Sequence, residues 1–231
     1  MSIRVYIVTE GQTETNFVKT VLVPHFQIFD ITLVPFTVVT KNDKKTGRQY
    51  KGGISHYQKA KRDILKCMTY TKNPSVYVST FFDFYRLPAD FPGYIDAQRI
   101  NDPYQKVEFL EKSLQDDIRK NGPSFLPYLS LHEFEALLFS NIDVIEEHFF
   151  DRDVTSLTDT VSQYQNPELI NNGEQTSPSK RILQCVPEYI KPTDGVKIAQ
   201  KIGLDALRAK CGHFDNWIGK LEKLESSRLV E

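Results

Sequence analysis

The stretch Ile3-Arg-Val-Tyr-Ile-Val-Thr-Glu10-Gly11 is an apolar, β-branched run that ends in an acidic residue. A second run of the same kind, Ser75-Val-Tyr-Val-Ser-Thr-Phe-Phe-Asp83, also ends in an acid. Such runs are typical of strands that are buried on both faces of a parallel sheet. Open α/β sheets bind ligands beyond the carboxyl ends of their strands, so we expect the two carboxylates to lie at a ligand-binding edge.

The rest of the chain alternates between strand and helix patterns, which predicts an α/β fold with a mainly parallel sheet flanked by helices. Strands are predicted over residues 3–9, 32–39, 76–82 and 125–131, and helices over residues 13–23, 54–68, 103–120 and 132–139. Pro24 is expected to end the first helix, and residues 41–53 to form a basic loop. From residue 144 the pattern is helical with proline breaks. We therefore expect an α/β domain over residues 1–143 and a helical C-terminal part, residues 144–231, packed on it.

The composition is that of a soluble globular protein with no overall attraction to nucleic acid. Of 231 residues, 40% are hydrophobic and 26% are charged, and the formal net charge is −1. Phosphate binding would therefore need a local basic patch, for which residues 41–51 and 59–66 are candidates. No run approaches the roughly 18 apolar residues of a membrane span, so no membrane association is expected. Three scattered cysteines favour a reducing cytoplasm over a disulfide framework.

Carboxylates at shielded strand ends need a compensating cation, basic side chain or row of N–H groups. Mg²⁺ and similar hard ions meet that need with one or two carboxylates while they keep several waters. The two strand-end acids therefore predict Mg²⁺ or Mn²⁺ as a cofactor.

Two motifs resemble the Toprim domain of topoisomerases, primases and the overcoming-lysogenization-defect nucleases. The first is Val8-Thr-Glu10-Gly11-Gln-Thr-Glu14. The second is Asp83-Phe84-Tyr85, in which Tyr85 stands where a Toprim domain usually carries a second metal-binding carboxylate. The resemblance implies a Toprim-like fold and metal-dependent cleavage of phosphodiesters.

The order of several short motifs is similar to that of the bacterial domain-of-unknown-function family 4276. The motifs are Glu10-Gly-Gln-Thr-Glu14, Lys51-Gly-Gly53, Asp83-Phe-Tyr85, Leu87-Pro88, Phe91-Pro-Gly93, His132-Glu-Phe-Glu-Ala-Leu-Leu138, Ser179-Lys-Arg181, Cys211-Gly-His-Phe214 and Trp217. This resemblance implies a Toprim-like protein that is often encoded beside an ATPase in phage-defence loci.

Glu10 and Asp83 are the expected catalytic residues and metal ligands, and Glu14 lies one helical turn beyond Glu10. Each has a structural alternative that the sequence leaves open. Glu10 and Glu14 suit the start of a helix, where acids balance the dipole and take part in capping. Asp83 suits an ion pair with Arg86.

The segment His132-Glu133-Phe-Glu135 supplies the expected third acid. Glu133 is predicted to be catalytic, and both Glu133 and Glu135 are predicted metal ligands. His132 and Glu135 are three residues apart, so on a helix they would share a face, which suits metal binding or proton transfer. The alternative is a helix start that is rich in acids.

Basic residues give the candidate nucleic-acid contacts. The family resemblance implies that Lys51, Lys180 and Arg181 touch phosphates. From the residues alone, a solvated loop is the preferred interpretation of Lys51-Gly-Gly53, and Lys180 and Arg181 share this ambiguity. His213, Trp217 and Cys211 are expected to pack the C-terminal helices.

The sequence therefore favours a metal-dependent, Toprim-like nuclease that acts on DNA or RNA. The alternative is a non-catalytic module that binds nucleic acid or nucleotide and is the partner of an ATPase. Nucleotide-binding enzymes of other types are disfavoured, because no Gly-x-Gly-x-x-Gly or phosphate-loop sequence is present,.

Overall fold

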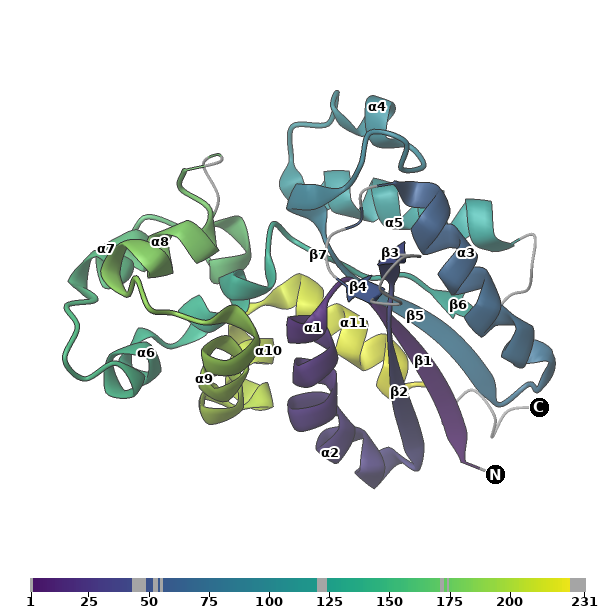
Figure 1. Cartoon of the computed structure of the whole chain (residues 1–231), viewed down its shortest axis with the longest axis horizontal. Coiled ribbons are helices and arrows are strands. Elements are labelled where there is room, and N and C mark those ends of the chain that lie inside the picture. The colour runs from purple at the N-terminus through teal and green to yellow at the C-terminus, as the bar shows by residue number, and fades with distance from the viewer. Residues whose placement is uncertain are drawn as a thin grey trace.

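A central parallel sheet organises the molecule, as the sequence predicts (Figure 1). The computed structural model describes residues 2–42, 49–51, 54, 56–119, 124–170, 173 and 175–224. The strands lie in the order β2-β1-β5-β6, and β7 pairs with the end of β5. Their bounds are β1 (Ile3–Thr9), β2 (Ile31–Thr37), β5 (Val76–Asp83), β6 (Phe125–Leu126) and β7 (Leu129–Ser130). All pairings in this sheet are parallel.

The order of the strands places a topological switch point between β1 and β5. From β1 the chain passes through α1 (Gln12–Phe17), the π-helical turn η1 (Val18–Leu22), α2 (Val23–Phe26) and η2 (Gln27–Phe29) to β2 on one side. It then passes through α3 (Tyr57–Met68) and η3 (Thr69–Lys72) to β5 on the other side of β1. Ligand sites of open α/β sheets lie at such a point.

The remaining elements follow β5. In the α/β part they are η4 (Phe84–Arg86), α4 (Tyr94–Ala97) and α5 (Pro103–Arg119). η5 (Phe134–Ser140) also precedes residue 144, and α6 (Ile142–His148) crosses into the helical part. The helical part then contains α7 (Thr155–Ser162), η6 (Pro167–Leu169), α8 (Pro178–Cys185), η7 (Lys191–Gly195), α9 (Val196–Ile202), α10 (Leu204–Lys210) and α11 (Gly212–Glu222).

Each face of the sheet buries its own hydrophobic core, because side chains alternate along a strand. Val5 and Ile7 of β1 join the core of α1 and the C-terminal helices, whereas Val8 joins the core of α3 and α5. In β5, Phe81 and Phe82 divide in the same way. Figure 1 shows α1, α2 and α11 on one side of the sheet, and α3 and α5 on the other. The helical C-terminal part thus covers one face of the sheet.

Three expectations about local structure are wrong. The first helix continues past Pro24, because this proline lies in the first turn of α2, where a missing N–H costs no helical hydrogen bond,. Part of the expected basic loop pairs as an antiparallel hairpin of β3 (Val39–Asn42) and β4 (Gln49–Lys51). Residues 132 and 133 are not helical, since η5 begins at Phe134.

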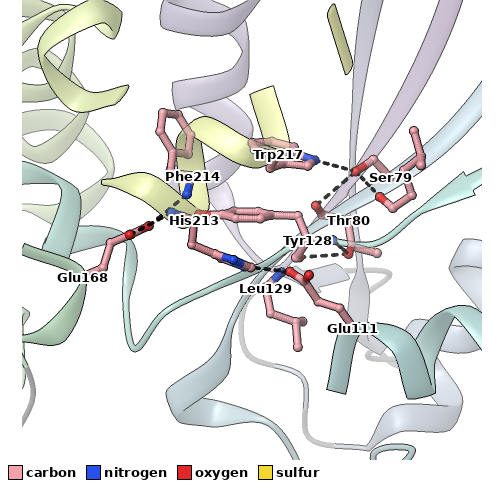
Figure 2. A network of polar contacts seen from close by, with 10 residues as sticks. Ser79, Thr80, Glu111, Tyr128, Leu129, Glu168, His213, Phe214 and Trp217 are labelled. Carbon is pink, nitrogen blue, oxygen red and sulfur yellow. Dashed lines mark hydrogen bonds and ion pairs between the residues drawn. The ribbon is translucent and has the colours of Figure 1, made fainter. Parts of the chain in front are cut away.

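Aromatic and polar contacts hold α11 against the sheet (Figure 2). The Trp217 indole is buried, donates from Nε1 to Ser79 Oγ at 2.9 Å and stacks on Tyr128 with ring centroids 4.3 Å apart. His213 Nε2 lies 2.9 Å from Glu111 Oε1 of α5. The prediction that His213 and Trp217 pack the C-terminal helices is therefore confirmed.

A buried carboxylate caps the N-terminal end of α11. Glu168, 2% exposed, accepts hydrogen bonds from the backbone N–H groups of His213 at 3.0 Å and Phe214 at 2.9 Å. Tyr104 donates its hydroxyl to the same carboxylate at 3.1 Å. These N–H groups have no partner within the helix, so Glu168 satisfies them from η6.

Replacing Glu168 by alanine is expected to destabilise the chain. Two buried N–H donors lose their acceptor, which costs about 1–3 kcal/mol. In a chain of this size each kcal/mol lowers Tm by about 2–4 °C, and thermal unfolding followed by circular dichroism measures the shift. Glu146→Ala, at an exposed glutamate of α6, is the control. Equal shifts in both variants would contradict the capping role.

Candidate active site at the carboxyl edge of the sheet

Glu10 and Asp83 meet at the switch point, as their positions at the strand ends predict. Asp83 is the last residue of β5, and Glu10 follows β1 directly. The register pairs Thr9 with Phe81, which brings the next residues of both strands to one edge. The Asp83 backbone N–H donates to Glu10 Oε2 at 3.2 Å. Both residues are almost fully buried: Glu10 as a whole is 6% exposed and Asp83 as a whole 4%.

Glu14 joins the same edge from the first turn of α1. Its Oε2 accepts from the backbone N–H of Gly11 at 2.9 Å, so it also caps the start of this helix. A chain of buried hydroxyls fixes α1 to the sheet: Thr15 Oγ1 lies 2.6 Å from Thr9 Oγ1 and 2.6 Å from Thr37 Oγ1. The metal-binding and capping interpretations of Glu14 are therefore compatible in this geometry.

Lys191 supplies a cation to this cluster, and sequence reasoning missed it. Its Nζ lies 2.8 Å from Glu135 Oε2 and 3.5 Å from Asp83 Oδ2. Glu135 is fully buried, and Tyr189 donates its hydroxyl to Glu135 Oε1 at 3.4 Å. Lys191 stands 108 residues after Asp83 in a helical region, so no local pattern links the two. The available signal was that buried acids require a cation.

The segment that carries Lys191 is attached to α1. Lys191 begins η7, a single π-helical turn, and Asn16 donates from Nδ2 to the carbonyl of Pro192 at 3.2 Å. Within the turn, the backbone N–H of Ile190 donates to Asp194 Oδ2 at 2.8 Å. A Cβ at Gly195 would collide with the Tyr189 hydroxyl, so glycine permits this packing. Single π-helical turns occur frequently at functional sites.

The prediction that His132 and Glu135 share a helical face is wrong. His132 adopts a left-handed backbone with φ of 64°, and Glu133 is extended with φ of −142°. Contacts to β5 and the turn after it impose this path: the His132 carbonyl accepts from the N–H of Tyr85 at 3.1 Å, and Phe134 N–H donates to Asp83 Oδ1 at 3.0 Å. Burial lowers the pKa of His132 to about 4, so its imidazole is neutral near pH 7.

Glu133 has a structural contact of its own. Its Oε2 accepts from the N–H of Ser179 at 3.0 Å, in the first turn of α8. This carboxylate is buried, and its charge adds to the effect of burial, which is the main cause of the raised pKa of Asp83 and of Glu135. Glu133 therefore connects the acid cluster to the helical part.

The predicted nucleic-acid contacts differ in their surroundings. The Arg181 guanidinium is used internally, donating from Nε to the Thr176 carbonyl at 2.8 Å and from Nη1 to Thr160 Oγ1 at 3.1 Å. Lys180 is exposed on α8. Lys51 belongs to β4, but its side chain lies outside the described part, as do Gly52, Gly53 and the side chain of Arg86.

If all of its carboxyl groups were ionised, the cluster would carry more negative charge than its described basic groups neutralise. Burial, followed by the charges of Asp83 and Glu14, raises the pKa of Glu10 to about 8. Burial likewise raises the pKa of Glu14 and of Glu135 to about 7, and raises that of Asp83. Although burial alone lowers it, the Asp83 and Glu135 carboxylates hold the pKa of Lys191 well above its usual value.

The donor chemistry suits a hard divalent cation, because the converging side chains offer carboxylate oxygens. The arrangement is nevertheless closed: within the residues that the structure describes, no group of three His, Cys, Asp or Glu side chains is placed to hold a metal ion. The Lys191 ammonium lies against two of the carboxylates instead.

Two surface hollows lie away from the acid cluster. One of about 360 Å³ lies between α5 and α11 and is lined by Glu108, Glu111, Lys112, Gln115, Leu126, Pro127, His213, Asn216 and Lys220. The other, of about 430 Å³, runs along the basic helix α3. There Lys61 pairs with Asp117 at 2.8 Å and Lys66 with Asp63 at 2.9 Å, so the positive charge of this patch is partly neutralised.

A family model described as a domain of unknown function (DUF4276) matches residues 9–222. The chain belongs to this DUF4276 family. The match contains Glu10, Glu14, Asp83, Glu133, Glu135 and Lys191, so the whole acid cluster lies within the family domain. No curated protein and no solved structure matches the chain. Within the described ranges, no helix combines the length and apolar character that a bilayer crossing requires.

Thermal stability is expected to fall as the pH rises from about 5 to about 8. Glu10, Glu14 and Glu135 have higher pKa values in the folded chain than the ordinary 4.5. The native state therefore binds more protons than the unfolded state in this window, and stability decreases with increasing pH. Glu10→Gln removes one of these groups and should flatten the dependence by about 1 kcal/mol or more.

Tm measured from pH 5 to pH 8 at constant ionic strength checks this prediction. Glu146→Gln, an exposed glutamate, controls for the charge change and should keep the wild-type slope. If Glu10→Gln also keeps that slope, Glu10 is ionised throughout and the prediction is wrong.

Proposed function

We propose that this DUF4276 protein is a metal-dependent nuclease of the Toprim-like type, which cleaves phosphodiester bonds of DNA or RNA. The observation that carries the proposal is the hydrogen bond between the Asp83 N–H and the Glu10 carboxylate, 3.2 Å long, at the switch point of a parallel sheet. Sites of this kind are where open α/β sheets place their chemistry.

Glu10, Glu14 and Asp83 are the residues that would hold Mg²⁺ or Mn²⁺ once their side chains turn toward a common ion, because among the described residues no three of these types are placed to hold one as they stand. When bound, the ion would supply a Lewis acid for the phosphate and a source of activated water. Three carboxylates at one edge favour one ion rather than two, and Tyr85 of η4, which stands in place of a second acid after β5, supports this. Glu135 would act through Lys191, and Glu133 through its contact with α8. These two acids would then position the site rather than coordinate the ion directly.

Substrate contacts are proposed to come from exposed basic groups outside the acid cluster. Lys180 lies on α8, the helix whose first turn contacts Glu133. Arg181 is disfavoured as a phosphate contact because its guanidinium holds α8 to the Thr160 hydroxyl and the Thr176 carbonyl. A cytoplasmic role in phage defence beside a partner ATPase belongs to the same proposal and is supported by the three free cysteines and the resemblance of the motifs.

The test is cleavage of labelled single- and double-stranded DNA and RNA with Mg²⁺ or Mn²⁺. Wild type is expected to cleave at least one substrate, and EDTA to abolish cleavage. Asp83→Asn and Glu10→Gln remove charges at the proposed ion and should lower the rate by about 100-fold or more. Glu146→Gln is the matched surface control and should cleave like wild type. Equal rates in wild type and Asp83→Asn would overturn the proposal.

The ion pairs of Lys191 favour a second candidate, a non-catalytic module that associates with an ATPase. A lysine held by Asp83 and Glu135 is sufficient to stabilise part of the acid cluster without any metal,. For this candidate we expect no cleavage of any substrate and no heat on titration with Mn²⁺. Tight association with the ATPase, unaffected by Asp83→Asn, would favour the module over the nuclease.

A further inference from the structure

We infer that Lys191 is a tethered cation that competes with a divalent metal for the same carboxylates. The inference deepens the proposed function and rests on its metal site. It concerns the disagreement between a donor set that suits a hard ion and an arrangement that is closed around an ammonium group. In this view the structure is the lysine-bound state of the site, and metal binding requires the Lys191 ammonium to leave Asp83.

The contacts of Lys191 support the competition. Its Nζ lies 3.5 Å from Asp83 Oδ2 and 2.8 Å from Glu135 Oε2, so it bridges a strand-end acid and an η5 acid. The other Asp83 oxygen, Oδ1, accepts from the Phe134 N–H. The Asp83 oxygen turned toward Lys191 is thus the one that an incoming ion would share with the ammonium. Two positive charges against one carboxylate repel each other strongly in a shielded site.

The exposure of the residues shows how the lysine can leave. The Lys191 side chain is 32% exposed, whereas Glu135 is 0% and Asp83 6% exposed at the side chain. The long, flexible lysine stem can therefore swing toward solvent while the carboxylates stay in place. The stem begins in η7, whose Pro192 carbonyl accepts a hydrogen bond from Asn16 of α1, which attaches the backbone of this turn to α1.

Competition and cooperation between Lys191 and a metal ion predict opposite changes in metal affinity when the ammonium is removed. If Lys191 and the ion exclude each other, removing the ammonium must strengthen metal binding, and adding metal must free the ammonium to the same extent. If Lys191 instead helps to hold a metal-bound state, its removal weakens metal binding. The sign of one measured change therefore separates the two roles.

The first experiment is calorimetric titration of the whole chain with Mn²⁺ alone. Lys191→Met keeps the length of the stem and removes the charge, and it should bind Mn²⁺ about tenfold or more tightly than wild type. Lys197→Met, at an exposed lysine of α9, is the matched control and should bind like wild type. Equal or weaker binding by Lys191→Met overturns the competition and leaves the proposed function standing. If wild type and both variants bind no Mn²⁺, the inference and the proposed metal site fail together.

A second experiment uses wild type only, so it does not depend on how the variant folds. The chain is labelled briefly with an amine-acetylating reagent at fixed pH, and the modification of Lys191 and Lys197 is compared by peptide mass spectrometry. In metal-free protein the two ion pairs should protect Lys191. Saturating Mn²⁺ should raise the labelling of Lys191 several-fold relative to Lys197. An unchanged ratio at a Mn²⁺ concentration that saturates the calorimetric titration overturns the inference.

Discussion

The ion pairs of Lys191 are the interaction on which the acid cluster depends. Five acids lie buried at or near one edge of the sheet: Glu10, Glu14, Asp83, Glu133 and Glu135. Burial makes each ionised carboxylate costly, and backbone N–H groups, the Tyr189 hydroxyl and the Lys191 ammonium offset part of this cost,. The raised pKa values of Glu10, Glu14 and Glu135 indicate that the compensation is incomplete. A site whose buried carboxylates lack sufficient compensating positive charge is suited to exchange protons or cations with its surroundings.

The same interactions explain why the helical C-terminal part belongs to the site. Glu135 and Lys191 pair across η5 and η7, and Glu133 reaches the first turn of α8. Glu168 and Trp217 attach α11 to its neighbours and to β5. Because the cluster draws residues from both parts, neither the sheet nor the helices alone would present it. The DUF4276 match over residues 9–222 spans this whole set.

The sequence predicted the sheet and its acids because both follow from local pattern. Continuous apolar runs identify β1 and β5, and strand-end acids at a switch point must converge once the strands pair in parallel. Local pattern does not predict the backbone conformation of His132 or the position of Lys191. His132 turns into the left-handed region because tertiary hydrogen bonds at Tyr85 and Asp83 override the helical pattern around it. Lys191 meets Asp83 only through the packing of η7 on α1, which periodicity cannot encode.

The left-handed residue His132 and the crowded carboxylates lie at the same place, which indicates how the site affects the stability of the fold. His132, with its φ of 64°, directly precedes Glu133 and joins the turn that brings Phe134 N–H to Asp83. Left-handed backbone at a non-glycine residue persists only where surrounding contacts over-determine it, and such residues cluster at ligand sites. Carboxylates crowded within this frame lower stability at neutral pH, whereas the hydrophobic cores on both faces of the sheet supply it. The stability lost to crowded charge at this edge is consistent with the cation site that we propose there, and the ion pairs of Lys191 limit that loss.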